Sequence, residues 1–142
     1  MAYTYTIHDQ AEGAGAMFLS IDTADPRPIY QQVADGIKEL IARGELGQGA
    51  ALPPVRQLAA DLGVNLNTIA AAYRELQKEG LISIAHGAGS VVTSRRAVER
   101  TQDQLLRPLR AALTDLVLSG LPASRIESLV LRELRGAGKG GK

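Results

Sequence analysis

The sequence contains no cysteine among its 142 residues. This absence excludes a disulfide framework, a thiolate metal site and an enzyme with a cysteine nucleophile. No apolar run approaches the roughly 18 residues that a membrane-spanning helix requires, and the first residues lack the basic-then-apolar pattern of a signal peptide. We therefore expect a protein that is neither exported nor inserted into a membrane, and we place it in the cytoplasm.

Aromatic residues and histidines are scarce. The chain has four tyrosines, one phenylalanine and no tryptophan, which disfavours binding of single-stranded nucleic acid by base stacking. The two histidines are His8 and His86, and no HxxxH, GxSxG, GxxxxGK or paired-carboxylate pattern occurs. We therefore predict that the protein is not an enzyme and has no metal or other cofactor.

Net positive charge is also small, at +1, and it is unevenly distributed. Residues 1–26 carry four acidic and no basic residues, residues 27–93 carry six of each sign, and residues 94–142 carry ten basic and five acidic residues. The hydrophobic content of 45% and the charged content of 22% are typical of a folded globular protein with one small core. If this chain binds nucleic acid, the fold must gather basic side chains on one surface.

Apolar residues recur at helical spacing in three segments, which run from Pro28 to Gly44, from Pro53 to Gly63 and from Asn65 to Gly80. Asn65 is the expected N-cap of the third helix. The predicted inward faces are Ile29, Val33, Ile37, Leu40 and Ile41 in the first helix, Val55, Leu58, Ala59 and Leu62 in the second, and Ile69, Tyr73 and Leu76 in the third.

A β-hairpin is expected next, because β-branched runs at 82–84 and 91–93 flank a glycine-rich turn. The second and third helices, joined by a short glycine-containing turn, form a helix-turn-helix, and the hairpin makes it the winged form. The predicted fold class is therefore mainly α with a small β-hairpin. It consists of a winged helix-turn-helix followed by a two-helix dimerisation element.

Four parts are expected along the chain: a mobile arm at 1–16, the winged domain at 17–94, a helical element at 95–135 and a disordered basic tail at 136–142. A long helix is predicted from about Arg96 to Leu118, with Pro108 kinking or dividing it, and a last helix ends near Arg135. The predicted inward residues are Val98, Leu105, Leu109, Leu113, Leu116 and Val117, followed by Ile126, Leu129, Val130 and Leu134. This stripe either packs within one chain or forms the seam of a homodimer, and we favour the dimer because two helices cannot bury it alone.

The stretch from Pro28 to Val92 resembles the N-terminal DNA-binding domain of the GntR family of bacterial transcription regulators. The matching pieces are PIYQQV, IARGEL, LPPVRQLAADLGVNLNT, AYRELQKEGLI and HGAGSVV, in the order and at the spacing of the family. The short remainder is similar to the YtrA subfamily, whose C-terminal part is a small helical dimerisation element. The resemblance implies a homodimeric regulator, usually a repressor, that binds double-stranded DNA and is released by a small effector. A two-fold dimer demands an inverted-repeat operator.

The resemblance also implies which residues contact DNA. Arg56 matches the arginine at the start of the second helix, and the remaining predicted contacts are Asn65, Asn67 and Thr68 at the start of the recognition helix and His86 and Gly87 at the wing tip. Helix N-termini present side chains and backbone N–H groups to phosphates and base edges. The chain departs from the pattern of many members, which carry arginine at Leu66 and Ala70, a basic residue at Ala88 and an aromatic residue at Val91.

Helical spacing alone indicates the outer face of the third helix, which comprises Asn67, Ala70, Ala71, Arg74 and Lys78. Asparagine can bond bidentately to adenine in the major groove, and alanine methyl groups can contact the methyl group of thymine. We therefore expect a half-site that tolerates A·T pairs.

Each assignment has a structural alternative. Arg56 could pair with Asp61 or Glu45 on the surface, Asn65 could act only as a cap, and His86 could be an ordinary turn residue. Arg74 could pair with Glu79, and Lys78 could pair with Glu75. The neutral segment 27–93 also fits a winged-helix module that binds a protein rather than DNA, and the salt sensitivity of binding distinguishes the two.

Overall fold

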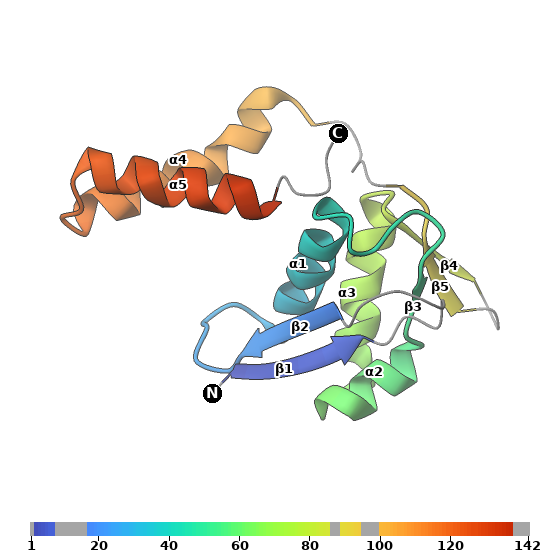
Figure 1. The fold of residues 1–142 in the computed structure, drawn as a ribbon. Helices are drawn as coiled ribbons and strands as arrows, with labels where there is room; N and C mark the ends of the chain where they lie inside the picture. The colour runs from blue at the N-terminus through green and yellow to red at the C-terminus, as the bar shows by residue number, and fades with distance from the viewer. Residues whose placement is uncertain (1, 8–16, 86–88, 95–99, 138–142) are drawn as a thin grey trace.

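The computed structural model describes residues 2–7, 17–85, 89–94 and 100–137 of the chain. The described residues form five helices and five strands (Figure 1). In chain order these elements are β1 (Ala2–Ile7), β2 (Met17–Asp22), α1 (Ile29–Ala42), β3 (Ala51–Leu52), α2 (Val55–Leu62), α3 (Leu66–Lys78), β4 (Ile82–Ala85), β5 (Gly89–Val92), α4 (Gln102–Leu118) and α5 (Ala123–Ala137).

The helices α1, α2 and α3 enclose one hydrophobic core. Their predicted inward faces are confirmed, because these residues belong to the core cluster or pack against it. Val33, Ile37, Leu58, Ile69 and Tyr73 are 0% exposed. The first part of the chain thus folds as the predicted mainly helical winged domain.

The turn between α2 and α3 is formed by Gly63 and Asn65. Gly63 ends α2 with φ at +67°, in the left-handed region that glycine adopts without strain. Asn65 then caps α3, since its side-chain oxygen accepts a hydrogen bond of 2.8 Å from the backbone N–H of Asn67. The predicted cap is therefore confirmed, and it sets the angle at which α3 leaves the turn.

The predicted hairpin is present as β4 and β5, and a third strand that the sequence did not suggest joins it. The sheet is antiparallel with the order β3-β5-β4, and Ala51 of β3 pairs with Val91 of β5. A strand of two residues is too short to show an alternating pattern. Because β3 pairs with β5, the wing is hydrogen-bonded to the segment that leads into α2.

The N-terminal residues 2–7 do not form the mobile arm that we expected. They form β1, which pairs antiparallel with β2 in a register that runs from Ala2 opposite Asp22 to Ile7 opposite Met17. Leu19 of β2 is 1% exposed and belongs to the core, and β2 lies along α1 (Figure 1). Residues 8–16 lie outside the described residues, so the expectation of mobility there stays a prediction.

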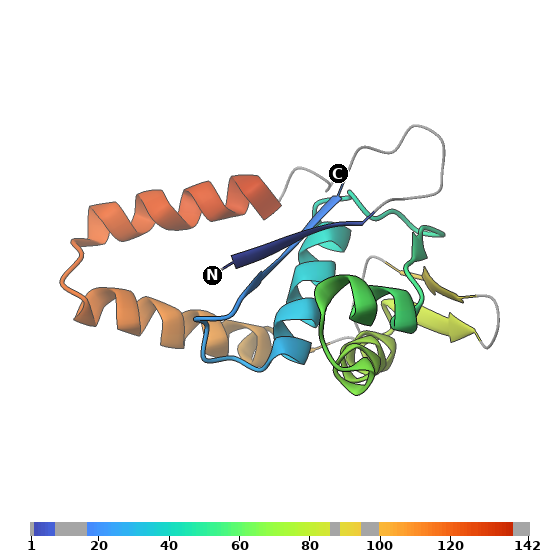
Figure 2. The same cartoon turned by 90° about the horizontal axis from the view of Figure 1, so that it is seen from below.

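The helices α4 and α5 run antiparallel and project from the winged domain as an arm (Figure 2). The helix α4 begins at Gln102 rather than near Arg96, because Thr101 and Gln104 form a capping box with reciprocal bonds of 3.2 and 3.0 Å. Pro108 lies inside this helix without dividing it, and α5 continues past Arg135 to Ala137, into the stretch expected to be a disordered tail. Val98 lies outside the described residues.

The apolar stripe of α4 is not buried within the chain, so of the two alternatives considered for it, packing within one chain is wrong for α4. No residue of α4 is buried, and Leu105, Leu109 and Val117 are 57%, 44% and 61% exposed. In α5, Ile126 is 7% exposed and Leu134 is 60% exposed. Among the described residues, no helix is both long enough and apolar enough to cross a membrane.

Candidate nucleic-acid interface

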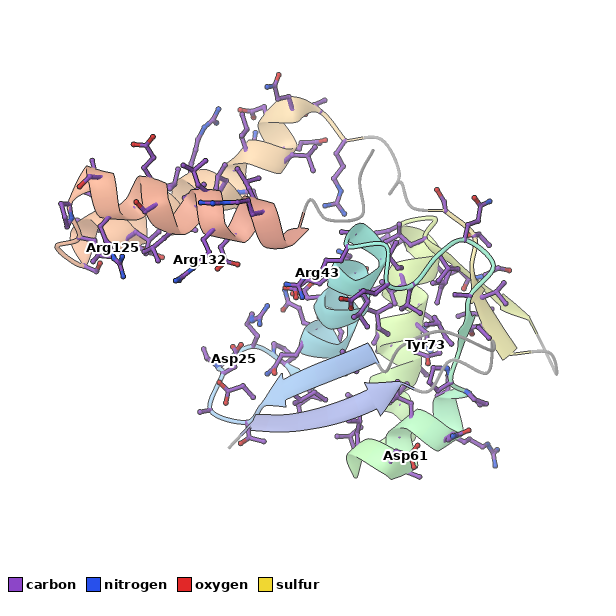
Figure 3. All side chains as sticks on the ribbon, in the orientation of Figure 1. Asp25, Arg43, Asp61, Tyr73, Arg125 and Arg132 are labelled. Carbon is purple, nitrogen blue, oxygen red and sulfur yellow. The ribbon has the colours of Figure 1, made fainter. Side chains whose placement is uncertain are left out.

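The helix-turn-helix is held together by a buried tyrosine. Tyr73 of α3 is 0% exposed, and its hydroxyl donates a hydrogen bond of 2.6 Å to the carbonyl of Pro53, at the entry to α2. Figure 3 shows Tyr73 between the two helices and Asp61 on α2. Pro53 directly follows β3 and leads into α2. The hydrogen bond from Tyr73 therefore connects the recognition helix α3 to the start of α2 and to the sheet.

Arg56 is the second residue of α2 and is exposed. The surface pairing considered above is not formed, since among the described residues no ion pair joins Arg56 to Asp61 or Glu45. Arg56 is therefore an exposed cation without an ion pair among the described residues, at the N-terminal end of the first helix of the motif.

The polar residues at the start of α3 occupy the cap and the first turn. Asn65 and Asn67 are exposed and Thr68 is half-buried. The side-chain oxygen of Asn65 is engaged in the cap, which leaves its amide nitrogen as a donor for a ligand. The side chain of Asn67 takes no part in the cap, so its amide offers two donors and an acceptor oxygen to a ligand.

The outer face of α3 is as predicted. Ala70 and Ala71 are half-buried, while Arg74 and Lys78 are exposed. The two helical ion pairs that we considered are absent from the described residues. Glu79 is buried and pairs instead with Lys38 of α1 and with Arg100, which precedes α4. The cations of α3 are therefore directed outward.

His86 and Gly87 lie outside the described residues. The strands β4 and β5, whose ends Ala85 and Gly89 are paired, flank these two residues in the sequence. Their expected contact with DNA thus stays a prediction.

The basic residues of the neutral segment 27–93 fall into two groups according to whether they form ion pairs. Three of its six basic residues form ion pairs: Arg27 with Asp25 and Asp35, Lys38 with Glu79, and Arg43 with Glu39. In the part of the chain that the structure describes, no ion pair engages the other three, which are Arg56, Arg74 and Lys78. All three of these lie on α2 and α3. Within the described part of residues 27–93, the basic residues without an ion pair therefore all lie on the helix-turn-helix.

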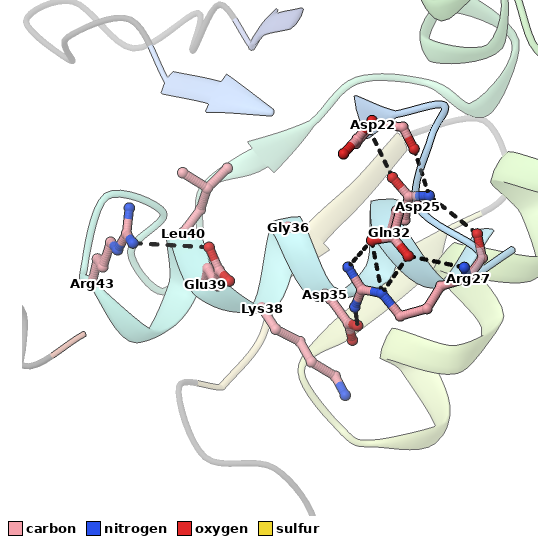
Figure 4. A pocket seen from close by; sticks show the side chains of 10 residues that line it. All are labelled: Asp22, Asp25, Arg27, Gln32, Asp35, Gly36, Lys38, Glu39, Leu40 and Arg43. Carbon is pink, nitrogen blue, oxygen red and sulfur yellow. Dashed lines mark hydrogen bonds and ion pairs between the residues drawn. The ribbon is translucent and has the colours of Figure 1, made fainter. Parts of the chain in front are cut away.

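A polar pocket lies beside α1, and most of its charged side chains form ion pairs (Figure 4). Arg27 donates to Asp25 and Asp35 at 2.8 Å each. The hydrogen bond from the Arg27 side chain holds the pKa of the half-buried Asp25 carboxyl below its ordinary value. Gln32 is buried and bonds the backbone of Asp22 in both directions. This network orders the connection from β2 to α1, and the described residues contain no cluster suited to a metal ion.

Three helices, a helix-turn-helix with outward cations and a three-stranded wing define the class of winged-helix DNA-binding regulators. Residues 29–92 match the family described as bacterial regulatory proteins of the gntR family. The chain is 31% identical to the HTH-type transcriptional repressor YtrA of Bacillus subtilis (strain 168) over 127 residues, which cover 87% of this chain and 97% of that protein.

Solved structures agree with this assignment. A protein of Listeria monocytogenes EGD-e described as a transcriptional antiterminator has a TM-score of 0.72 and 28% identity, covering 83% of this chain and 90% of that one. YtrA from Sulfolobus acidocaldarius, a GntR-family transcription factor, has a TM-score of 0.55 and 42% identity, covering 68% and 97%. The chain belongs to the GntR family, and its relatives include YtrA-type regulators. These relatives are transcription regulators, so the prediction that the chain is not an enzyme is confirmed.

Proposed function

We propose that this chain is a transcriptional repressor that binds an inverted-repeat operator in double-stranded DNA as a homodimer, in the cytoplasm. The observation that carries the proposal is the charge arrangement, since Arg56, Arg74 and Lys78 are exposed on α2 and α3 without an ion-pair partner among the described residues. Phosphate contacts supply most of the affinity of such proteins, and a helix-turn-helix inserts its second helix into the major groove.

The proposed contacts fall into two kinds. Arg56 and Asn67 have exposed planar groups that can form bidentate bonds with guanine and adenine, respectively. Asn65, Thr68, His86 and Gly87 are proposed as further contacts, to the backbone or to base edges. Arg74 and Lys78 are suited to phosphate contacts on either side of the groove.

The homodimer is supported by the exposed apolar residues of the arm. Leu105 and Leu109 face solvent on α4, and a groove of about 470 Å³ between α4 and α5 is lined by apolar side chains such as Leu113, Val117 and Ile126. A single neutral domain cannot easily reach the roughly 10⁻⁸ M affinity of specific regulators, whereas two linked domains can. Release by a small effector is a further proposal that rests on the family alone.

The test begins with selection of bound duplexes from random DNA by the full-length protein, which tests binding, symmetry and base preference together. Arg56→Ala is then compared with Arg43→Ala, which removes the same charge from a residue already paired on α1. If Arg56 reads a base, we expect its loss to weaken binding by about 1–3 kcal/mol and to relax preference at one position of each half-site. Unchanged affinity in Arg56→Ala, or an equal loss in Arg43→Ala, contradicts the assignment.

Salt dependence separates DNA binding from the alternative of a protein-binding module. If Arg56 contacts phosphate instead, binding falls about equally on all duplexes, and the slope of log K against log salt shrinks by about one unit per contact. An apolar protein interface lacks this steep dependence. Retention on duplex DNA that does not weaken as salt rises therefore favours the protein-binding module.

A further inference from the structure

Three charged side chains from separate parts of the chain meet at the C-terminal end of the recognition helix. Glu79 is the C-cap residue of α3 and is 8% exposed. The Nζ atom of Lys38 in α1 lies 2.9 Å from its Oε1 atom and 2.7 Å from its Oε2 atom. Arg100, which immediately precedes the N-cap Thr101 of α4, forms an ion pair with Oε1 through Nη2. One buried carboxylate therefore binds two cations.

The two cations have different structural consequences. Lys38 and Glu79 both belong to the winged domain, and their side chains are 35% and 11% exposed, so this pair suffices to give the buried carboxylate a counter-charge. Arg100 is 48% exposed and belongs to the connection between the domain and the arm. Its ion pair adds little to neutralisation of Glu79, but it attaches the beginning of the arm to the end of the recognition helix.

The attachment reaches α4 without an intervening flexible residue. Arg100 is followed directly by Thr101, whose hydroxyl accepts from the backbone of Gln104 while the Gln104 side chain accepts from the backbone of Thr101. This capping box holds the first turn of α4, so a constraint on Arg100 is also a constraint on the direction of the helix.

We propose that the ion pair between Glu79 and Arg100 is a positioning contact that fixes the angle between the recognition helix and the arm, and thereby the half-site spacing that the dimer accepts. The inference rests on the proposed function, because spacing has meaning only for a dimer on an inverted repeat. A dimer with rigidly placed recognition helices accepts half-sites at one separation. A flexible connection accepts several separations and loses affinity for the best one.

Two variants of the full-length protein test the contact. Arg100→Gln and Lys38→Gln each remove one cation from Glu79, but only Arg100→Gln releases the arm. We expect the parent and Lys38→Gln to bind the selected operator much more tightly than one with four inserted base pairs. In Arg100→Gln this preference falls by about tenfold, and Arg100→Lys restores part of it. An undiminished preference in Arg100→Gln overturns the proposal. Equal weakening on all spacings also overturns it and indicates a direct phosphate contact by Arg100.

A second measurement needs no DNA. The chain has no cysteine, so spin labels at Ala60→Cys in α2 and Ala111→Cys in α4 report one distance when labelled protein is diluted with unlabelled protein. We expect a narrow distance distribution in the parent and in Lys38→Gln, and a broad one in Arg100→Gln. An unchanged distribution overturns the positioning role even if the protein binds its operator. Broadening in a protein that binds no DNA contradicts the proposed function and supports the contact.

Discussion

Tyr73 shows how a buried polar atom can hold a binding motif in shape. Its hydroxyl donates to the carbonyl of Pro53 at 2.6 Å from a side chain that is 0% exposed. We expect Tyr73→Phe to lower the free energy of unfolding by about 1 kcal/mol, because it leaves that carbonyl without its partner. Urea unfolding measures this change. Tyr30→Phe is the control, since Tyr30 is 37% exposed and should show no change; equal losses in both variants contradict the role of the Pro53 bond.

Asp25 provides a prediction for acid pH. The Arg27 side chain lowers the pKa of Asp25 below its ordinary value of 3.8 in the folded chain. The stability from this pairing is therefore fully present above pH 3.8 and is lost as pH falls through the lowered folded-state pKa. We expect Asp25→Asn to flatten the fall of Tm between neutral pH and acid pH, by a small amount because its partner Arg27 is about half exposed to solvent. Arg27→Gln should flatten it similarly. A parent-like acid profile in both variants contradicts this account.

At the scale of elements, the sequence predicts the helices and strands whose residue pattern extends over enough positions to be recognised. Three core helices, their glycine ends and the Asn65 cap follow from spacing and from local backbone chemistry. The strand β3 has only two residues, and β1 depends on a partner strand beyond nine intervening residues, so neither has a local signature. The start of α4 could have been found, because Thr101 and Gln104 have the spacing of a capping box.

The candidate site was also predictable in part, because some of its residues follow from local sequence patterns. The outward face of α3 follows from its period, and Arg56 from its place at the start of a helix. The partners of Glu79 were not predictable, since Lys38 and Arg100 lie 41 and 21 positions away and meet it only through tertiary packing. For Glu79, the sequence alone suggested only a pair with Arg74, which lies close to it along the chain.

The docking of β2 on α1 depends on a glycine within the helix. A Cβ atom at Gly36 would lie 2.3 Å from Cδ1 of Leu19, which is 1% exposed. Alanine in place of glycine favours a helix by about 1 kcal/mol, but overpacking costs about 1–3 kcal/mol. We therefore expect Gly36→Ala to destabilise the parent and to stabilise a Leu19→Ala variant by about 1 kcal/mol. A double-mutant cycle of urea unfolding measures both, and the same sign in both backgrounds would falsify this docking.

At the scale of the whole molecule, the arm formed by α4 and α5 exposes apolar side chains that a single chain does not bury. Leu109 and Leu118 are about two and a half helical turns apart and so lie on opposite sides of α4. They are 44% and 79% exposed. If the Leu109 side forms the seam, Leu109→Glu removes two buried leucines from the dimer. This change costs about 3 kcal/mol or more, roughly a hundredfold in dimer Kd. Sedimentation measures the dissociation, and Leu118→Glu is the matched control. If both substitutions change the dimer Kd equally, the dimer seam does not lie on the Leu109 side of α4.

The pairing of Arg27, Lys38 and Arg43 with carboxylates has a consequence for how the protein is distributed in a cell. Cations that are already compensated release few counterions from DNA, so among residues 27–93 the sequence-independent attraction to DNA depends on Arg56, Arg74 and Lys78. Under the proposed function, we therefore expect this domain to be held less strongly on the many unrelated sites that compete with an operator than a domain with six free cations. A larger share of the molecules is then available for the operator at a given number of copies per cell.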